Sequence, residues 1–170
     1  MKKLRCIIFL HVLLVWHTSS YGQLAIDRTT RFINLGVGFH GPAYHSGWHP
    51  AYLAGADFGI LPNTTVGLTG SYYRYKITDS HKYSSYSAGG RASYYFNSIL
   101  GRENKKLNYY AGMGVSYSSF SYSGLISKRG KVYVPGHIGA RRMFGKNFGA
   151  FAEVGFNDVG AVKFGLTARL

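Results

Sequence analysis

The residues best suited to acid–base chemistry in this sequence are His137 and Glu153. A serine hydroxyl attacks an acyl group efficiently when a histidine accepts its proton and a carboxylate orients that histidine. Two positions after the histidine, where a lipid-deacylating enzyme of this kind would carry the serine, the sequence has Gly139. The sequence therefore offers two members of a triad without the nucleophile, and a lipid-modifying enzyme is the third of the three functional hypotheses below.

A second group that could do chemistry is a set of histidines. His40, His45 and His49 lie close together with Trp48 beside them, and His81 follows further along the chain. Three imidazoles can ligate zinc or copper. Their spacing matches no metal motif and no carboxylate lies among them. We therefore expect solvated loop histidines, with no metal and no other cofactor.

The first 22 residues have the form of a secretion signal. Three basic residues among the first five precede the apolar stretch Cys6–Trp16, and Ser20 and Gly22 place small residues where a signal peptidase inspects them. The apolar stretch has 11 residues, well short of the roughly 20 that a helix needs to cross a bilayer. We expect export by the Sec route and cleavage after Gly22, which also removes the one cysteine of the chain.

Removing 22 of the 170 residues leaves one domain, residues 23–170, with 17 basic and six acidic residues. It is rich in Gly, Tyr, Phe and Ser rather than in helix-forming residues, so strands and turns are favoured. Apolar residues that alternate with a period of two predict eight strands. These are residues 31–40, 52–60, 65–76, 83–96, 107–118, 131–144, 148–156 and 161–170. Within the sixth, Pro135 has no amide hydrogen, so we expect a bulge or a later start there.

The two faces of these strands differ in charge. The apolar face carries no charged residue over the strand cores, whereas the opposite face carries Asp57, Arg91, His137, Arg141, Glu153, Lys163 and Arg169. A soluble barrel would have charge on the outside and apolar residues within. A lysine or arginine facing lipid at mid-depth costs about 2–4 kcal/mol, and unpaired backbone groups cannot remain in hydrocarbon, so the sheet must close. The pattern predicts an all-β, eight-stranded, antiparallel up-and-down transmembrane β-barrel.

Three stretches alternate glycine with aromatic and small apolar residues: 109–115, 147–156 and 162–170. They resemble the small outer-membrane β-barrel domains of Gram-negative bacteria, and the resemblance extends over residues 23–170. It implies a place in the outer membrane, insertion by the barrel assembly machinery and both termini in the periplasm. Such barrels commonly finish on an aromatic residue; this chain finishes on Leu170, and we expect Phe164 to supply the aromatic side chain.

This orientation assigns the connections between strands. Residues 61–64, 97–106 and 145–147 are expected in the periplasm, and residues 41–50, 77–82, 118–130 and 157–160 outside. Aromatic residues at strand ends suit the two interfacial girdles: Tyr72, Tyr75, Tyr94, Tyr95, Phe96, Tyr117 and Phe148.

Some outer-loop residues are candidate contacts for a partner: His45, Trp48, His49, Phe120, Tyr122, Lys128 and Arg129. Aromatic residues with basic neighbours suit packing against lipid headgroups and lipopolysaccharide, or contact with an external ligand that the sequence does not identify. Nucleic acid is not expected, because the basic residues lie singly at strand ends or inside the barrel rather than in a stripe.

The interior of an eight-stranded barrel is about wide enough to be filled by side chains. We therefore expect the seven inward charged or titratable residues to form a hydrogen-bonded plug. The first hypothesis is a non-enzymatic integral outer-membrane protein with a structural or surface-interaction role in the cell envelope. Because cations are in excess inside, a small-solute or anion channel is the second.

Overall fold

The computed structural model describes residues 26–39, 50–78, 81–97, 107–122, 128–156 and 160–170. It contains nine β-strands: β1 (Arg31–Phe39), β2 (Pro50–Leu61), β3 (Thr64–Thr78), β4 (His81–Tyr95), β5 (Leu107–Tyr122), β6 (Lys128–Tyr133), β7 (Gly136–Met143), β8 (Phe148–Phe156) and β9 (Val162–Arg169). Over these ranges the structure has no helix with the length and apolar character needed to span a membrane.

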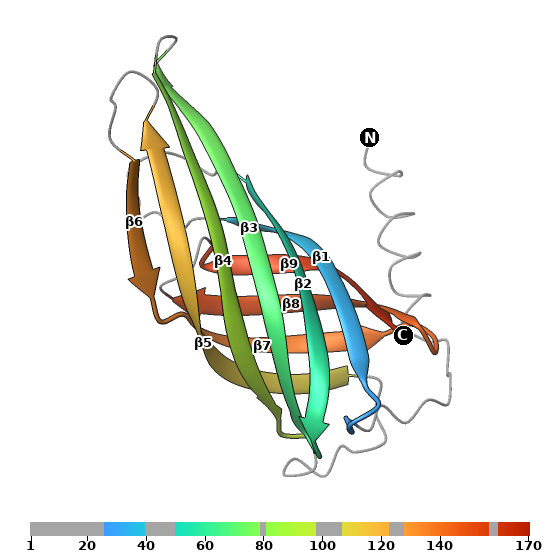
Figure 1. Cartoon of the computed structure of the whole chain (residues 1–170). Helices are drawn as coiled ribbons and strands as arrows, with labels where there is room; N and C mark the ends of the chain where they lie inside the picture. Colours follow the sequence, from blue (N-terminus) through green and yellow to red (C-terminus); the bar gives the residue numbers. More distant parts are fainter. Residues whose placement is uncertain (1–25, 40–49, 79–80, 98–106, 123–127, 157–159) are drawn as a thin grey trace, which may run out of the picture.

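The strands form one antiparallel sheet that closes on itself (Figure 1). β1 pairs with β2 on one side and with β9 on the other, and β5 joins β4 to both β6 and β7. Because β6 and β7 follow each other along the same edge of β5, they share one position, and the ring has eight strand positions. The prediction of a closed, eight-stranded, antiparallel barrel is confirmed.

The sixth predicted strand is divided at Pro135. β5 pairs with both parts in one register, Ser116 opposite Tyr133 and Met113 opposite Gly136. The carbonyl of Pro135 still accepts a hydrogen bond from the Gly114 amide at 2.9 Å. The irregularity therefore lies where the sequence predicts it. The register does not change, so the expected bulge is wrong, whereas a later start is found: β7, the part that pairs with β8, begins at Gly136, and the separate strand β6 precedes it.

β3, β4, β5 and β6 extend further than the sequence predicted. Residues 77–82 and 118–130 were expected to be outer loops, yet β3 runs to Thr78, β4 begins at His81, β5 runs to Tyr122 and β6 begins at Lys128. Phe120, Tyr122, Lys128 and Arg129 are therefore strand residues, and the ladder pairs Phe120 with Arg129. The serine-rich composition suggests a loop, but serine alternates with aromatic residues in Ser119–Tyr122, and a paired neighbouring strand is enough to keep such a segment extended.

The barrel is apolar outside and charged inside. Leu35, Leu68, Ile138 and Leu166 on the outward face are 61% to 68% exposed, while inward-facing residues such as Asp57, Arg141 and Glu153 are buried. A water-soluble domain rarely exposes so continuous an apolar surface. The predicted assignment of the two faces is thus confirmed on residues from six strands.

An aromatic girdle requires rings that face outward, and some of the aromatic residues named in the sequence analysis do so whereas Tyr95 does not; the side chain of Tyr75 lies outside the described residues. Tyr94, Tyr117 and Phe148 are exposed on the outward face, and the rings of Tyr72 and Tyr86 lie 4.9 Å apart. Tyr95, expected in a girdle, is instead 1% exposed and belongs to an interior cluster of buried residues: Ile26, Phe32, Tyr95, Tyr110 and Met143. The chain alternates through Tyr94 and Tyr95, so only one of the two adjacent rings can face outward.

The segment before β1, residues 26–30, packs against the β2–β3 turn at the end of the barrel that holds the interior cluster. The amide of Asn63 donates to the Ile26 carbonyl at 3.0 Å, and Asn63 has φ of 59°, the left-handed value that the tight β2–β3 turn requires. The Thr29 and Thr30 hydroxyls donate to the exposed carboxylate of Asp27, and these hydrogen bonds lower its pKa. The turn thereby holds Ile26 in place within the interior cluster.

Candidate functional site

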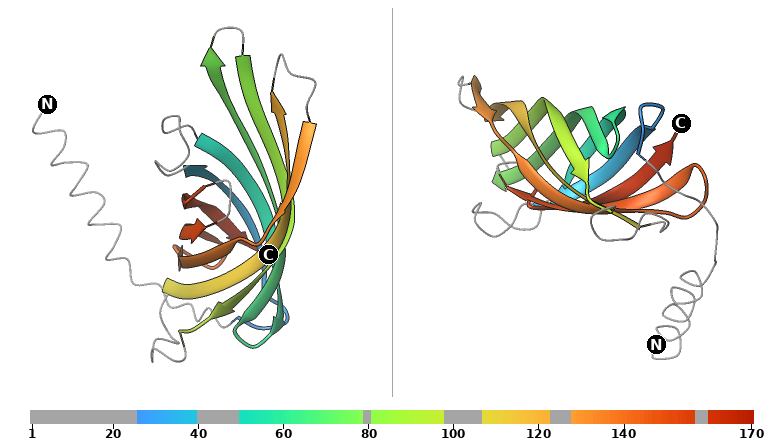
Figure 2. Two further views of the ribbon diagram at one scale, coloured as in Figure 1. Left: turned by 90° about the vertical axis from the view of Figure 1, so that its left-hand side faces the viewer. Right: turned by 90° about the horizontal axis from the view of Figure 1, so that it is seen from below.

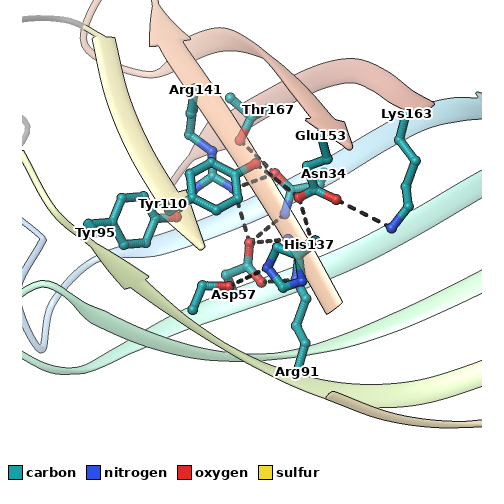
Figure 3. Close-up of polar contacts among 11 residues, drawn as sticks. Asn34, Asp57, Arg91, Tyr95, Tyr110, His137, Arg141, Glu153, Lys163 and Thr167 are labelled. Atoms are coloured by element: carbon teal, nitrogen blue, oxygen red, sulfur yellow. Dashed lines mark hydrogen bonds and ion pairs between the residues drawn. The ribbon is translucent and has the colours of Figure 1, made fainter. Parts of the chain in front are cut away.

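Asp57 on β2 is the centre of a buried network of polar side chains (Figure 3). Arg91 on β4 donates two hydrogen bonds to its carboxylate, from Nε at 2.9 Å and from Nη2 at 2.8 Å. Arg141 on β7 donates from Nη2 at 3.0 Å, and Asn34 on β1 donates from Nδ2 at 2.8 Å. Two-pronged contact between a guanidinium and a carboxylate is among the strongest polar interactions in proteins.

Glu153 on β8 is the second carboxylate of the network. Its Oε1 accepts hydrogen bonds from Arg91 Nη1 at 2.8 Å and from the Tyr110 hydroxyl at 2.9 Å. Lys163 Nζ lies 3.5 Å from Oε2. Arg91 therefore bridges both carboxylates, and Glu153 connects β4, β5 and β9 through the lumen.

Arg141 crosses the barrel. In the ring of eight strand positions, β7 and β2 lie four positions apart, so the Arg141–Asp57 contact spans the full width of the lumen. Arg141 Nη1 also donates to the Tyr95 hydroxyl at 2.8 Å, and its guanidinium lies 3.9 Å from the centre of the Phe32 ring. An arginine held by a carboxylate, a hydroxyl and an aromatic face can be buried without losing its charge.

The network leaves little free space. Its three cations and two carboxylates have side chains between 0% and 11% exposed. A cavity of about 50 Å³ adjoins it, lined in part by Arg91, Glu153 and Lys163 and by Thr69 and Ser71. Since one water occupies roughly 10–15 Å³ of such a cavity, this cavity holds only a few waters. The network can therefore hold the strands of the barrel together and obstruct the lumen.

His137 makes a contact that the sequence did not reveal. Its Nε2 lies 2.9 Å from the hydroxyl of Ser93 on β4, so the structure supplies a serine where position 139 does not. The carboxylate of Glu153, however, is occupied by Arg91, Tyr110 and Lys163 rather than by the histidine. Among the residues that the structure describes, no carboxylate orients the Ser93–His137 pair, and the two residues are only 3% and 6% exposed.

Gly139 is explained by packing around Glu153. A Cβ at this position would lie 2.7 Å from the ring of Tyr110 and 2.9 Å from both the Ala152 carbonyl oxygen and Glu153 Cγ. A serine there, as an enzyme would need, has no room beside the network. The residue that argues against catalysis in the sequence is thus one that the plug requires.

The seven inward residues named in the sequence analysis do not all meet. Asp57, Arg91, Arg141, Glu153 and Lys163 form the network, and His137 lies beside it on Ser93. Arg169 is remote: it pairs with Phe32 at the end of β9, and its charge acts on Asp27. Sequence reasoning also missed the uncharged members of the site: Asn34, Ser93, Tyr95, Tyr110 and Thr167. Asn34 and Ser93 have the inward register of the period-two pattern, and this register is the signal in the sequence that points to them.

The outer candidates are described only in part. His45, Trp48 and His49 lie outside the described residues, as does His40. Phe120 lies on β5, Tyr122 ends that strand, and Lys128 and Arg129 begin β6. Within the described ranges, no three histidine, cysteine, aspartate or glutamate residues are placed to hold a metal ion.

Comparison with known proteins reveals similarity in fold. No protein-family model and no curated protein matches the sequence. Among solved structures, the N-terminal β-barrel domain of Pseudomonas aeruginosa OprF superimposes with a TM-score of 0.61 at 12% identity, covering 85% of this chain and 98% of that one. Neisserial surface protein A gives 0.59 at 16% identity, with coverage of 82% and 92%. The Yersinia pestis outer-membrane protein Ail in a phospholipid nanodisc gives 0.55 at 14% identity, with coverage of 84% and 99%. The chain thus has the fold of the small eight-stranded outer-membrane β-barrels.

Proposed function

We propose that residues 23–170 form an integral outer-membrane protein with a closed interior and a non-enzymatic, structural or surface-interaction role in the cell envelope. The observation that carries the proposal is the contrast between an exposed apolar band and a buried ionic network. In water this arrangement exposes aliphatic side chains and buries charge, both unfavourably. In a bilayer the same band contacts acyl chains, and the closed ladder satisfies the backbone groups.

The leader and the orientation belong to the same proposal. Residues 1–22 direct export by the Sec route, the barrel assembly machinery inserts the barrel, and both ends of residues 23–170 face the periplasm. The contact between the Leu170 amide and the Arg31 carbonyl, at 3.1 Å, supports placing both ends on one side of the membrane. Protease treatment of intact cells tests the orientation: sites engineered in the 123–127 connection should be cut, and sites after Asn63 or Lys146 should be protected.

A plugged barrel is favoured over a channel because the Arg141–Asp57 ion pair joins strands on opposite sides of the barrel. Arg91 adds bonds to Asp57 and Glu153 across the same interior. Conductance of refolded protein in a planar bilayer tests this: the plug predicts no stable current steps. Stable steps of uniform size would instead support the small-solute or anion channel.

The non-enzymatic role is supported by the burial of Ser93 and His137 and by the engagement of Glu153 elsewhere. A lipid substrate would have to reach a hydroxyl enclosed within the lumen. Incubation with lipopolysaccharide followed by mass spectrometry of the lipid tests the assignment. Deacylated product that disappears in a Ser93→Ala variant would replace this proposal with the enzyme.

The proposed lipid partners are phospholipid and lipopolysaccharide. Arg74 is exposed on the outward face of β3, two residues beyond Tyr72, which packs against Tyr86. A cation just beyond an aromatic girdle suits the phosphate groups of a lipid headgroup. Membrane fractionation, with gel migration compared before and after heating, tests the location: the protein should sediment with the outer membrane and migrate differently when unfolded.

A further inference from the structure

Four strands continue past the closed part of the barrel. The last pair between β2 and β3 is Ala51 with Tyr73, while β3 and β4 remain paired as far as Thr78 and His81. On the other side, β6 pairs with β5 before β7 begins at Gly136. We call residues 73–78, 81–85, 118–122 and 128–133 the outer sheet. It rises beyond β1, β7, β8 and β9 in Figure 1 and in the left view of Figure 2.

The inward face of the outer sheet carries a row of aromatic rings, one from each strand. Tyr73 and Tyr83 have ring centroids 6.1 Å apart, Tyr83 and Phe120 6.1 Å, and Phe120 and Tyr133 6.3 Å. Tyr73 is buried, whereas the next three rings are partly exposed. The exposed Lys131 completes the row, its Nζ 5.2 Å from the Tyr133 centroid.

Hydroxyl groups surround this aromatic row. The Ser71 and Ser87 oxygens lie 2.5 Å apart below it, and Ser85 and Ser118 are buried on the same inward face. A packed core of this width would use aliphatic residues, since serine adds polar groups that must be satisfied. Flat rings bordered by hydroxyls and one cation instead match a ligand with flat C–H faces, many hydroxyls and negative charge.

Charge also indicates the partner. Strands β3 to β6 contain seven basic residues and no acidic residue. Arg91 belongs to the plug, and the other six all lie in the outer sheet: Arg74, Lys76, Lys82, Lys128, Arg129 and Lys131. An excess of positive charge on these strands raises the local concentration of anionic partners and repels basic ones.

We propose that the inward face of the outer sheet binds an acidic polysaccharide from outside the cell. The C–H face of a sugar ring packs on the electron-rich faces of Phe120 and Tyr133, and Lys131 pairs with a carboxylate. The partly buried hydroxyls of Ser71 and Ser87 exchange hydrogen bonds with the sugar. The lipid of the protein's own membrane is the less suitable occupant, because the outward face with Tyr72, Tyr86 and Arg74 meets that lipid. The inference rests on the membrane placement and orientation proposed above.

The test uses the full mature chain refolded into nanodiscs and a matched pair of ligands. Oligogalacturonate carries one carboxylate per sugar, and its methyl ester has the same rings without the charge. Calorimetry at low ionic strength should give a dissociation constant at least about tenfold lower for the acid than for the ester, as loss of a charge-assisted bond requires. Equal affinity for the two ligands, or no binding of the acid by folded, inserted protein, would overturn the inference.

Matched variants separate the inward face from net charge. Lys131→Gln and Arg74→Gln each remove one positive charge from the outer sheet, on its inward and outward face respectively. We expect about a tenfold loss of acid binding for Lys131→Gln and less than about a twofold loss for Arg74→Gln. Equal losses would mean that charge alone attracts the ligand and would contradict the proposed face.

Phe120→Ala adds a test of ring stacking. It should weaken both the acid and the ester by a similar factor, since it removes a contact that does not depend on charge. An unchanged affinity for both ligands in a folded Phe120→Ala protein would remove the aromatic row from the site. Should this variant not fold, the Lys131→Gln and Arg74→Gln pair decides the question, because both side chains are exposed. Failure of the wild type to insert would instead count against the membrane proposal.

Discussion

Replacing Asp57 by asparagine should destabilise the barrel strongly without changing its shape. The carboxylate accepts four hydrogen bonds, two from Arg91, one from Arg141 and one from Asn34. Asparagine keeps the volume but removes the charge, and its amide group adds a donor where guanidinium donors already converge. Removing one partner of a buried ion pair costs about 3–5 kcal/mol. Because Arg91 keeps Glu153 and Arg141 keeps Tyr95, we expect the lower half of that range, about 3–4 kcal/mol.

The assay is urea unfolding of the barrel in lipid vesicles, followed by circular dichroism and by gel migration without heating. Asp27→Asn is the matched control, since Asp27 is exposed and its hydrogen bonds to Thr29 and Thr30 lie in a turn outside the network. Exposed polar pairs contribute about 0–1 kcal/mol. A loss in Asp57→Asn no larger than that in Asp27→Asn would refute the view that the ionic plug stabilises the barrel.

Three further predictions follow from individual positions. Leu166 is 62% exposed on the outward face, so Leu166→Arg places a cation against lipid and should reduce the free energy of unfolding by about 2–4 kcal/mol, measured by denaturant titration in vesicles. A reduction of less than about 1 kcal/mol would contradict lipid contact there. Gly139→Ser should destabilise the barrel by about 1–3 kcal/mol, because the added Cβ meets the Tyr110 ring and the Ala152 carbonyl. Thermal unfolding in detergent measures the effect, and an unchanged midpoint would mean that the neighbouring side chains move to make room for the serine. Arg91→Ala should make the refolded barrel conduct intermittently in planar bilayers where wild type does not, because it removes the bridge between Asp57 and Glu153; silent recordings from folded variant would mean that other side chains block the lumen.

The sequence was sufficient to predict which face each strand turns to lipid. Leu166 and Glu153 illustrate why. A period of two assigns alternate residues of each strand to opposite faces from local sequence alone. Placing the charged residues inside and the leucines outside then gives one register of faces that is consistent over all eight strands. The same rule made Pro135 a point of irregularity. It could not say that β5 would keep a single register across the proline, because that depends on the neighbouring strand.

Contacts inside the lumen were less accessible to sequence reasoning. Ser93 and His137 are 44 positions apart and meet because β4 and β7 lie on either side of β5, at a height set by strand stagger. Arg169 has the inward register but lies at the end of β9, too far along the axis to join Asp57. Facing can be deduced from periodicity, whereas height in the barrel depends on the registers of all the strands together.

The most direct test of the account compares two adjacent residues of β3. Leu68 is 68% exposed on the outward face, whereas Thr69 lines the interior cavity. A nitroxide attached to a cysteine at each position, in the barrel reconstituted in vesicles, reports contact with oxygen, which concentrates in lipid, and with a water-soluble nickel chelate. The account predicts high oxygen and low nickel accessibility at position 68 and little oxygen accessibility at position 69. A label at position 68 that meets the nickel chelate as readily as a surface residue would contradict it.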